Sequence, residues 1–179
     1  MACISKLSAG FAYDCDTGIT GLYTAFIINR DDISSFAFDS TGPIVNTLTL
    51  NSGAAAYRID TPKRTLVMSE ALKINEGAPN AFTHTAVMNV TKVQFASTLA
   101  SIITPTTNSP FVIATKDLAG ITRLYGLYYG LYATSIERSS HDNGGWYTIT
   151  LATPDQAIGE DAITILSTLY DSLYVAAKT

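Results

Sequence analysis

TLVMSEALKINEGAPNAFTHTAVMNV, residues 65–90, is the most informative stretch of this 179-residue chain. Apolar and polar residues alternate along 65–74 and again along 82–90, and this is the period of a half-buried β-strand. Between the two runs, NEGAPN at 75–80 is rich in residues that favour turns. The stretch therefore predicts a long β-hairpin, which we place at 61–93, with arms longer than the usual strand of about 5–6 residues.

Each arm of this hairpin is predicted to have an apolar and a polar face, with Glu70 and His84 interrupting the apolar one. The main apolar positions are Leu66, Met68, Leu72, Ile74, Phe82 and Met88. The main polar positions are Thr65, Ser69, Lys73, Thr83, Thr85, Asn89 and Thr91. A two-stranded ribbon is marginal in water by itself, so we expect its apolar face to rest on another part of the fold or on a neighbour.

Short strand signals surround the hairpin, because runs rich in Thr, Tyr, Ile and Val are separated by Gly, Asn or Asp. They predict strands at 22–29, 33–38, 44–50, 55–59, 111–115, 121–134 and 146–151. Apolar residues recur at helical spacing over 92–103, which predicts a helix that Pro105 ends. After Pro154 the pattern fits either a helix or a strand at 163–165. We expect a single mainly β domain at 1–179, an antiparallel β-sandwich or barrel with a flanking helix.

The composition excludes several classes of protein. Charged residues make up 15% of the chain, against about 25% in an average domain, while hydrophobic residues make up 47%. The chain is too apolar to be disordered. Its net charge of −4 gives no basic surface for gripping nucleic-acid phosphates. No apolar run approaches the roughly 20 residues of a membrane helix, so we expect no membrane partner. Such a chain should hide much of its surface in a core or against partner subunits.

The sequence also predicts neither export nor a bound cofactor. Residues 1–10 contain no apolar run of the kind that signal peptides have, so we expect Cys3 and Cys15 to be reduced thiols. Two cysteines without a matching Cys or His pair do not make a zinc site. A P-loop, a dinucleotide glycine fingerprint and paired metal-ligand spacing are all missing from the sequence. We therefore expect no metal and no cofactor.

Three positions could be read as catalytic, and each has a simpler interpretation. Asp16 opens an Asp-Thr-Gly triplet like that of aspartic proteases, but the preceding residues are not an apolar strand, which favours a turn. His141 lies beside Ser139 and Asp142, where the sequence predicts a solvated hairpin tip. His84 falls on the apolar hairpin face, which favours a packed, hydrogen-bonded histidine. We expect no catalysis.

Tyrosines gather between 125 and 132. Bases stack on such rings in single-strand binders, but those sites also need interleaved cations, and none lies between Arg123 and Arg138. The cluster therefore favours packing in a core or at a subunit interface.

The order of these elements resembles the tail-tube proteins of tailed bacteriophages, in which a long central hairpin is followed by a helix and a closing β-meander. The opening residues 1–3, Cys15 and the run GITGLY at 18–23 look like the start of some phage virion proteins. Asp117, Gly120, the pair at 125–126 and GGWYTITL at 144–151 look like a virion β-meander.

This resemblance implies a sandwich that assembles into stacked rings, commonly hexameric, around a DNA channel. Strands 65–74 and 82–90 would join those of neighbouring subunits in an inner barrel. The polar hairpin face would line the lumen, and the apolar face would pack on the sandwich and on the helix at 92–103. The implied partners are copies of the chain, other virion tail proteins and DNA as non-specific cargo. The protein would be made in the host cytoplasm and end in the virion tail.

Other functions remain open from the sequence. The chain could be a connector, a head-decoration protein or an inner-tube subunit of a phage-derived injection machine. From other classes, a β-sandwich adhesin or carbohydrate-binding module has similar strand statistics, and Asp16 could serve a dimeric aspartic-type protease.

Overall fold

The computed structural model describes residues 22–40, 43–59, 65–90, 106, 108–138, 146–155, 159–161 and 163–177. The described elements are β1 (Leu22–Asn29), η1 (Arg30–Asp32), β2 (Ile33–Phe38), β3 (Ile44–Leu50), β4 (Tyr57–Arg58), β5 (Val67–Lys73), β6 (Ala81–Val90), β7 (Phe111–Asp117), β8 (Thr122–Tyr125), β9 (Tyr132–Arg138), β10 (Tyr147–Ala152), β11 (Ile163–Ile165) and α3 (Ser167–Ala176).

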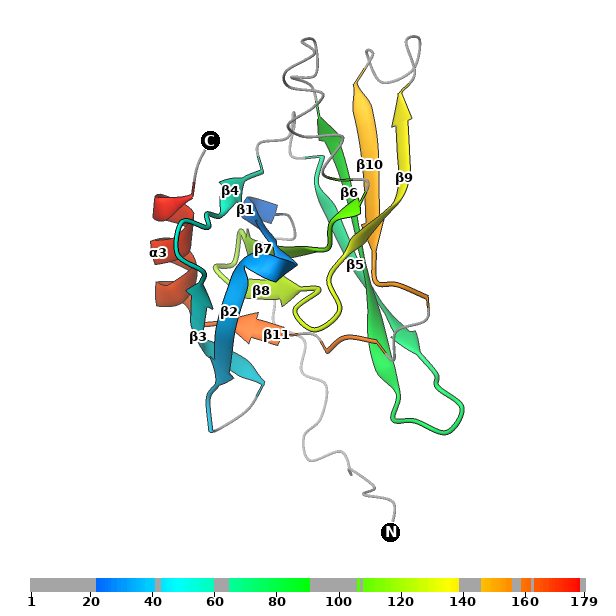
Figure 1. Cartoon of the computed structure of the whole chain (residues 1–179), viewed down its shortest axis with the longest axis horizontal. Helices are drawn as coiled ribbons and strands as arrows, with labels where there is room; N and C mark the ends of the chain where they lie inside the picture. The colour runs from blue at the N-terminus through cyan, green and yellow to red at the C-terminus, as the bar shows by residue number, and fades with distance from the viewer. Residues whose placement is uncertain are drawn as a thin grey trace.

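The strands form two sheets. A seven-stranded sheet has the order β2-β3-β11-β8-β7-β1-β4, and a four-stranded sheet has the order β5-β6-β10-β9. In Figure 1 the four-stranded sheet lies on one side of the seven-stranded sheet and α3 lies on the other. This mainly β, antiparallel, sandwich-like architecture confirms the predicted fold class. The predicted helix at 92–103 lies outside the described residues.

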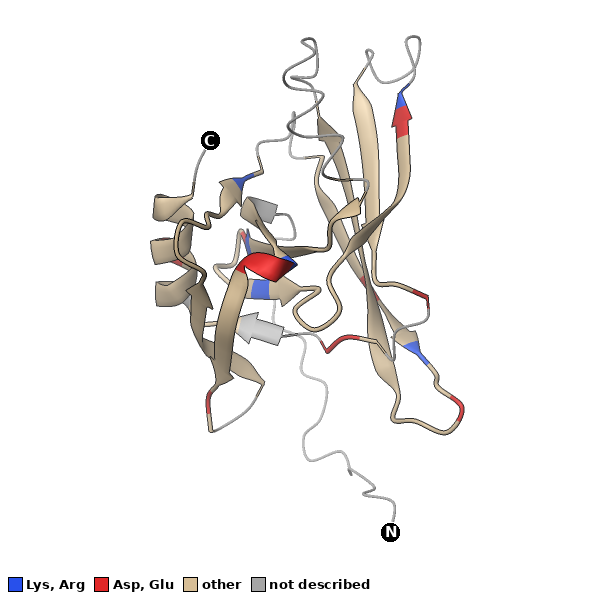
Figure 2. Cartoon of the chain, in the orientation of Figure 1, with Lys and Arg blue, Asp and Glu red and all other residues tan. Residues whose placement is uncertain are grey.

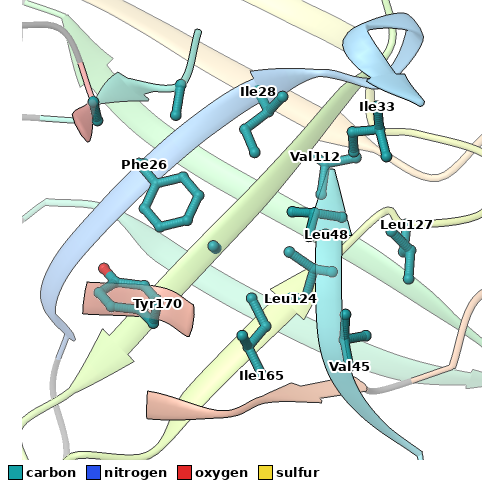
Figure 3. Packing of buried hydrophobic residues seen from close by; sticks show 13 residues of the cluster. Phe26, Ile28, Ile33, Val45, Leu48, Val112, Leu124, Leu127, Ile165 and Tyr170 are labelled. Carbon is teal, nitrogen blue, oxygen red and sulfur yellow. The ribbon is translucent and has the colours of Figure 1, made fainter. Parts of the chain in front are cut away.

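The centre of the seven-stranded sheet is buried on both faces, because β1 and β7 alternate between two cores. Phe26, Ile28 and Val112 point into the first core, together with side chains of α3 (Figure 3). Ala25 and Ile113 point into the second core, which lies between the two sheets. A strand covered on both faces must be apolar at successive positions, as the sequence of β7 is from residue 111 to residue 114.

The second core fixes the hairpin β5–β6 in the body of the molecule. β6 is paired on both sides, with β5 and with β10. Its inward residues Ala86 and Met88 are buried together with Ile149 and Leu151 of β10. The hairpin is thus half of the four-stranded sheet, while its turn end extends past the seven-stranded sheet in Figure 1.

The C-terminal segment contains both of the elements that the sequence left open. β11 lies between β3 and β8, parallel to β3 and antiparallel to β8. α3 then covers the first core with Tyr170, whose hydroxyl shares a 2.8 Å hydrogen bond with the Thr24 hydroxyl. Burial raises the pKa of Tyr170 to about 12, so this hydroxyl is neutral. At the other end of the helix, the Arg58 Nε donates to the Tyr174 carbonyl.

The predicted strand region 121–134 is wrong as a continuous element. It is divided into β8 and β9 by a loop at 126–131, which carries the chain from one sheet to the other. Gly126 and Gly130 allow this passage. Both have positive φ, and a Cβ on Gly126 would lie 2.7 Å from the Leu131 Cγ.

Replacing Gly126 with Ala should therefore destabilise the fold more than the same change in an open turn. Gly120→Ala is the matched control, since Gly120 has φ of +83° with nothing within 4 Å of a Cβ. The left-handed backbone alone costs about 1–2 kcal/mol, and the clash at Gly126 should add about 1–3 kcal/mol. Equal unfolding free energies for the two variants in urea titrations would contradict this account of the loop.

Candidate functional site

The four-stranded sheet presents an uncharged polar face on the side away from the second core. The registers place Ser69 opposite Thr85, Thr148 opposite Asn89 and Thr150 opposite Val87. These side chains alternate with the buried positions of β6 and β10 and therefore point outward. The Thr148 hydroxyl donates to the Asn89 side-chain oxygen at 2.9 Å, which links the two central strands on this face.

Charges lie at the margins of this face. β6 and β10 contain no Lys, Arg, Asp or Glu, and Figure 2 shows their ribbons without charged residues. Lys73 ends β5 and its Nζ donates to the Asp155 carbonyl at 2.8 Å. Glu70 belongs to the opposite, inward face, where it lies across from His84. The centre of the outer face thus offers hydroxyl and amide groups beside the apolar Val87, and no cation.

The predicted polar residues of the hairpin mostly lie on this outer face. Ser69, Lys73, Thr83 and Thr85 share it by register, and Asn89 continues it along β6. Thr65 precedes β5 and its hydroxyl is buried, so it offers little to a solvent-filled channel. Thr91 lies outside the described residues.

The predicted apolar residues of the hairpin fall into two groups. Leu66 and Met88 are buried in the second core. Met68 and Phe82 are half-buried. Leu72 is 59% exposed and Ile74 is 75% exposed at the turn end of the hairpin. Of the predicted apolar residues, the most exposed therefore lie near the turn, while Val67 is 58% exposed at the other end of β5.

Both outer strands of the four-stranded sheet have a free edge among the described strands. β5 pairs only with β6, and β9 pairs only with β10 in the part of the chain that the structure describes. A free edge is a row of unpaired backbone donors and acceptors that can add a further strand.

A buried polar group, the His84 imidazole, lies where the hairpin meets the seven-stranded sheet. His84 is fully buried, and its Nδ1 accepts a hydrogen bond from the Gly126 backbone N–H at 3.2 Å. Its ring stands edge-on to Tyr125 at 5.2 Å, and its Nε2 has no hydrogen-bond partner among the described residues. Burial lowers the pKa of His84 from 6.5 to about 4. The predicted packed, hydrogen-bonded histidine is confirmed.

Glu160 is a second buried polar group at the same junction, and only 1% of it is exposed. Its carboxylate accepts hydrogen bonds from the Tyr128 and Tyr129 backbone N–H groups at 2.8 and 2.5 Å. Its own backbone exchanges two 2.7 Å hydrogen bonds with Phe82 of β6. Burial raises the pKa of Glu160, while the backbone donors and the nearby Arg30 oppose that rise. An acidic pair at 160–161 is the only feature of the sequence that hints at this role.

The tyrosine cluster is divided between the interior and the surface. Tyr125 is buried in the second core, whereas Tyr128, Tyr129 and Tyr132 are each partly exposed. The Tyr128 ring contacts Phe36 and Phe38 of β2 at centroid distances of 6.0 and 6.4 Å.

The residues of the two catalytic alternatives lie outside the part of the chain that the structure describes. Asp16 and His141 lie outside it, as do Cys3 and Cys15. Its residues contain no group of three or more His, Cys, Asp or Glu that could hold a metal ion. Among them, no helix has the length and apolar character needed to span a membrane.

Comparison with known proteins found no match to this chain among protein-family models, curated proteins or solved structures.

Glu160→Ala should destabilise the protein, because it leaves the part-buried Tyr128 and Tyr129 N–H groups without their acceptor. Each such group costs about 1–3 kcal/mol, so we expect a loss of about 3 kcal/mol or more in urea unfolding. Asp161→Ala is the control at the exposed neighbouring position and should change stability by less than about 0.5 kcal/mol. Similar losses in both variants would show that the carboxylate at 160 has no special role.

Proposed function

We propose that this chain is a structural, non-catalytic subunit of a bacteriophage tail, a tail-tube or tail-ring protein that assembles into rings around a DNA channel. The four-stranded sheet supports this role most directly, because it combines two edges that are free among the described strands with an outer face whose two central strands carry no charged residue. The hexameric symmetry and the virion location come from the resemblance in the sequence.

The strand directions suit closure into a ring. β5, β6, β10 and β9 are antiparallel to their successive neighbours, so the two outer strands run in opposite directions. When copies are placed side by side, β9 of one copy meets β5 of the next in the antiparallel sense. Such a head-to-tail contact closes into a ring when its rotation divides the circle evenly, and closure removes every free edge of this sheet.

The outer face suits a channel through which DNA moves. Proteins hold DNA mainly by placing Lys and Arg on its phosphates, with release of counterions. The two central strands supply none of these cations, and Lys73 lies at the sheet margin against the Asp155 carbonyl. DNA would therefore meet hydroxyl and amide groups that hold its phosphates only weakly.

The exposed end of the hairpin gives the sharpest test of assembly. Ile74→Glu should prevent or greatly weaken assembly, because it places a charge where an apolar contact with a neighbour is expected. Val175→Glu is the matched control, since Val175 is also 75% exposed but lies on α3, on the opposite side of the molecule. Neither change touches a buried position, so both variants should keep the circular dichroism of the wild type.

We expect the wild type and Val175→Glu to form rings or tubes in negative-stain images and large particles in mass photometry as concentration rises. Ile74→Glu should form such assemblies only at a protein concentration at least tenfold higher than the wild type needs. A wild type that stays monomeric across the series would overturn the proposed function. If Ile74→Glu assembles as readily as the wild type, the end of the hairpin is not part of the interface.

A carbohydrate-binding module is the second candidate, favoured by the aromatic rings beside β2. Phe38 and Tyr128 are partly exposed and stack at 6.4 Å with an interplanar angle of 28°. The apolar face of a sugar ring packs well on such surfaces. This function predicts retardation in polysaccharide-containing native gels, lost in Tyr128→Ala and kept in Tyr132→Ala, whose ring is similarly exposed on β9. If no polysaccharide changes the gel mobility of the wild type, the carbohydrate-binding function is excluded.

A further inference from the structure

The loop at 126–131 joins the two sheets and is held from both sides by acceptors that can titrate. On one side the His84 Nδ1 accepts from the Gly126 N–H. On the other side the Glu160 carboxylate accepts from the Tyr128 and Tyr129 N–H groups. Within the same loop, Leu127 packs in the first core and Leu131 in the second. The loop therefore couples the hairpin to both cores.

The bond to Gly126 can exist only with an unprotonated Nδ1. The neutral His84 ring carries its proton on Nε2 and accepts at Nδ1. A second proton would go to Nδ1 and point at the Gly126 N–H, so that two donors would face each other. Gly126 has a positive φ, and its carbonyl accepts a hydrogen bond from the Gly130 N–H at 3.0 Å, so a shift that relieved this repulsion would disturb the loop itself.

We propose that His84 is an acid-sensitive latch, which holds the 126–131 loop on the four-stranded sheet at neutral pH and releases it in mild acid. Release would free the ring of Tyr128 from Phe36 and Phe38 and loosen the joint between the sheets. This inference does not depend on the proposed function, since it concerns only the packing within one chain.

The groups around His84 leave the charged imidazolium poorly compensated. Glu70 lies opposite on β5, but its carboxylate is 3.8 Å from the guanidinium of Arg123, which reaches it from β8. Tyr125 presents a ring whose hydroxyl pKa is raised by burial, so it is neutral in this range. From the end of β10, Thr153 accepts from the His84 backbone N–H with a hydroxyl that does not titrate.

Glu160 acts in the opposite direction. Its raised pKa means that the folded protein takes up this proton more readily than the unfolded chain. Acid therefore removes a costly buried charge at Glu160, while it adds one at His84. Protonation of His84, and not of Glu160, therefore drives the release in mild acid.

Hydrogen exchange with mass spectrometry on the full chain tests the latch. The pKa of His84 is about 4 in the closed state against 6.5 for a free histidine. Opening should then be about 20-fold more favourable at pH 5 than at pH 7, and the protection factors of peptides covering 122–135 should fall by about that factor. Peptides from the β2–β3 hairpin should keep their protection, which separates local release from global unfolding.

His84→Asn is the informative variant, because the asparagine oxygen can accept from the Gly126 N–H and does not titrate. It should show no such loss between pH 7 and pH 5, whereas the control His141→Asn, at the other histidine of the chain, should behave as the wild type. Unchanged wild-type protection at pH 5, or an equal loss in His84→Asn, would overturn the proposal. If His84→Asn does not fold, NMR of the histidine rings in the wild type is the deciding measurement. A His84 pKa near the ordinary value of 6.5, with the loop still protected from exchange, would also overturn the proposal.

Discussion

Burial of β1 and β7 on both faces is the constraint from which the rest of the architecture follows. Phe26 and Val112 on one face and Ile113 on the other are fully removed from solvent. Each such side chain contributes about 1.5–3 kcal/mol, so neither face can be left open. α3 covers one face and the four-stranded sheet covers the other. The low content of charged residues is partly explained by this, because a three-layer fold of 179 residues has many internal positions.

A chain that forms two sheets must cross from one sheet to the other. At the crossing 126–131, backbone N–H groups near the cores must find hydrogen-bond acceptors. Residues in this loop are near both cores, and the Gly126, Tyr128 and Tyr129 N–H groups donate to side chains instead of to a strand ladder. A buried N–H group needs an acceptor. His84 supplies one to Gly126, and Glu160 supplies two more to Tyr128 and Tyr129. These side chains thus replace the missing ladder, and the joint between the sheets acquires groups that respond to pH.

Alternation of apolar and polar residues was sufficient to predict most of the strands. β1, β2 and β3 have the bounds expected from the sequence, and the two arms of the hairpin differ only at their ends. The region 121–134 was misread because β-rich composition continues through the loop, where only the glycines mark a change of sheet. Glu160 could not be found by pattern, since its acceptor role depends on backbone groups some 30 residues away. The C-terminal segment fits both periods because it contains both a strand and a helix.

Among the residues that the structure describes, the edges of the four-stranded sheet carry few of the devices that keep a monomeric β-protein from pairing with its copies. Such proteins blunt edge strands with outward Lys, with Pro or with a covering helix. β5 has no Pro, its Glu70 points inward, and its Lys73 is turned to the Asp155 carbonyl. β9 has a bulge opposite Thr150 and Leu151, and two charged residues at one end. Edges that are open among the described strands, beside a hairpin end that exposes Leu72 and Ile74, are the features that support the proposed pairing of this sheet with copies of itself.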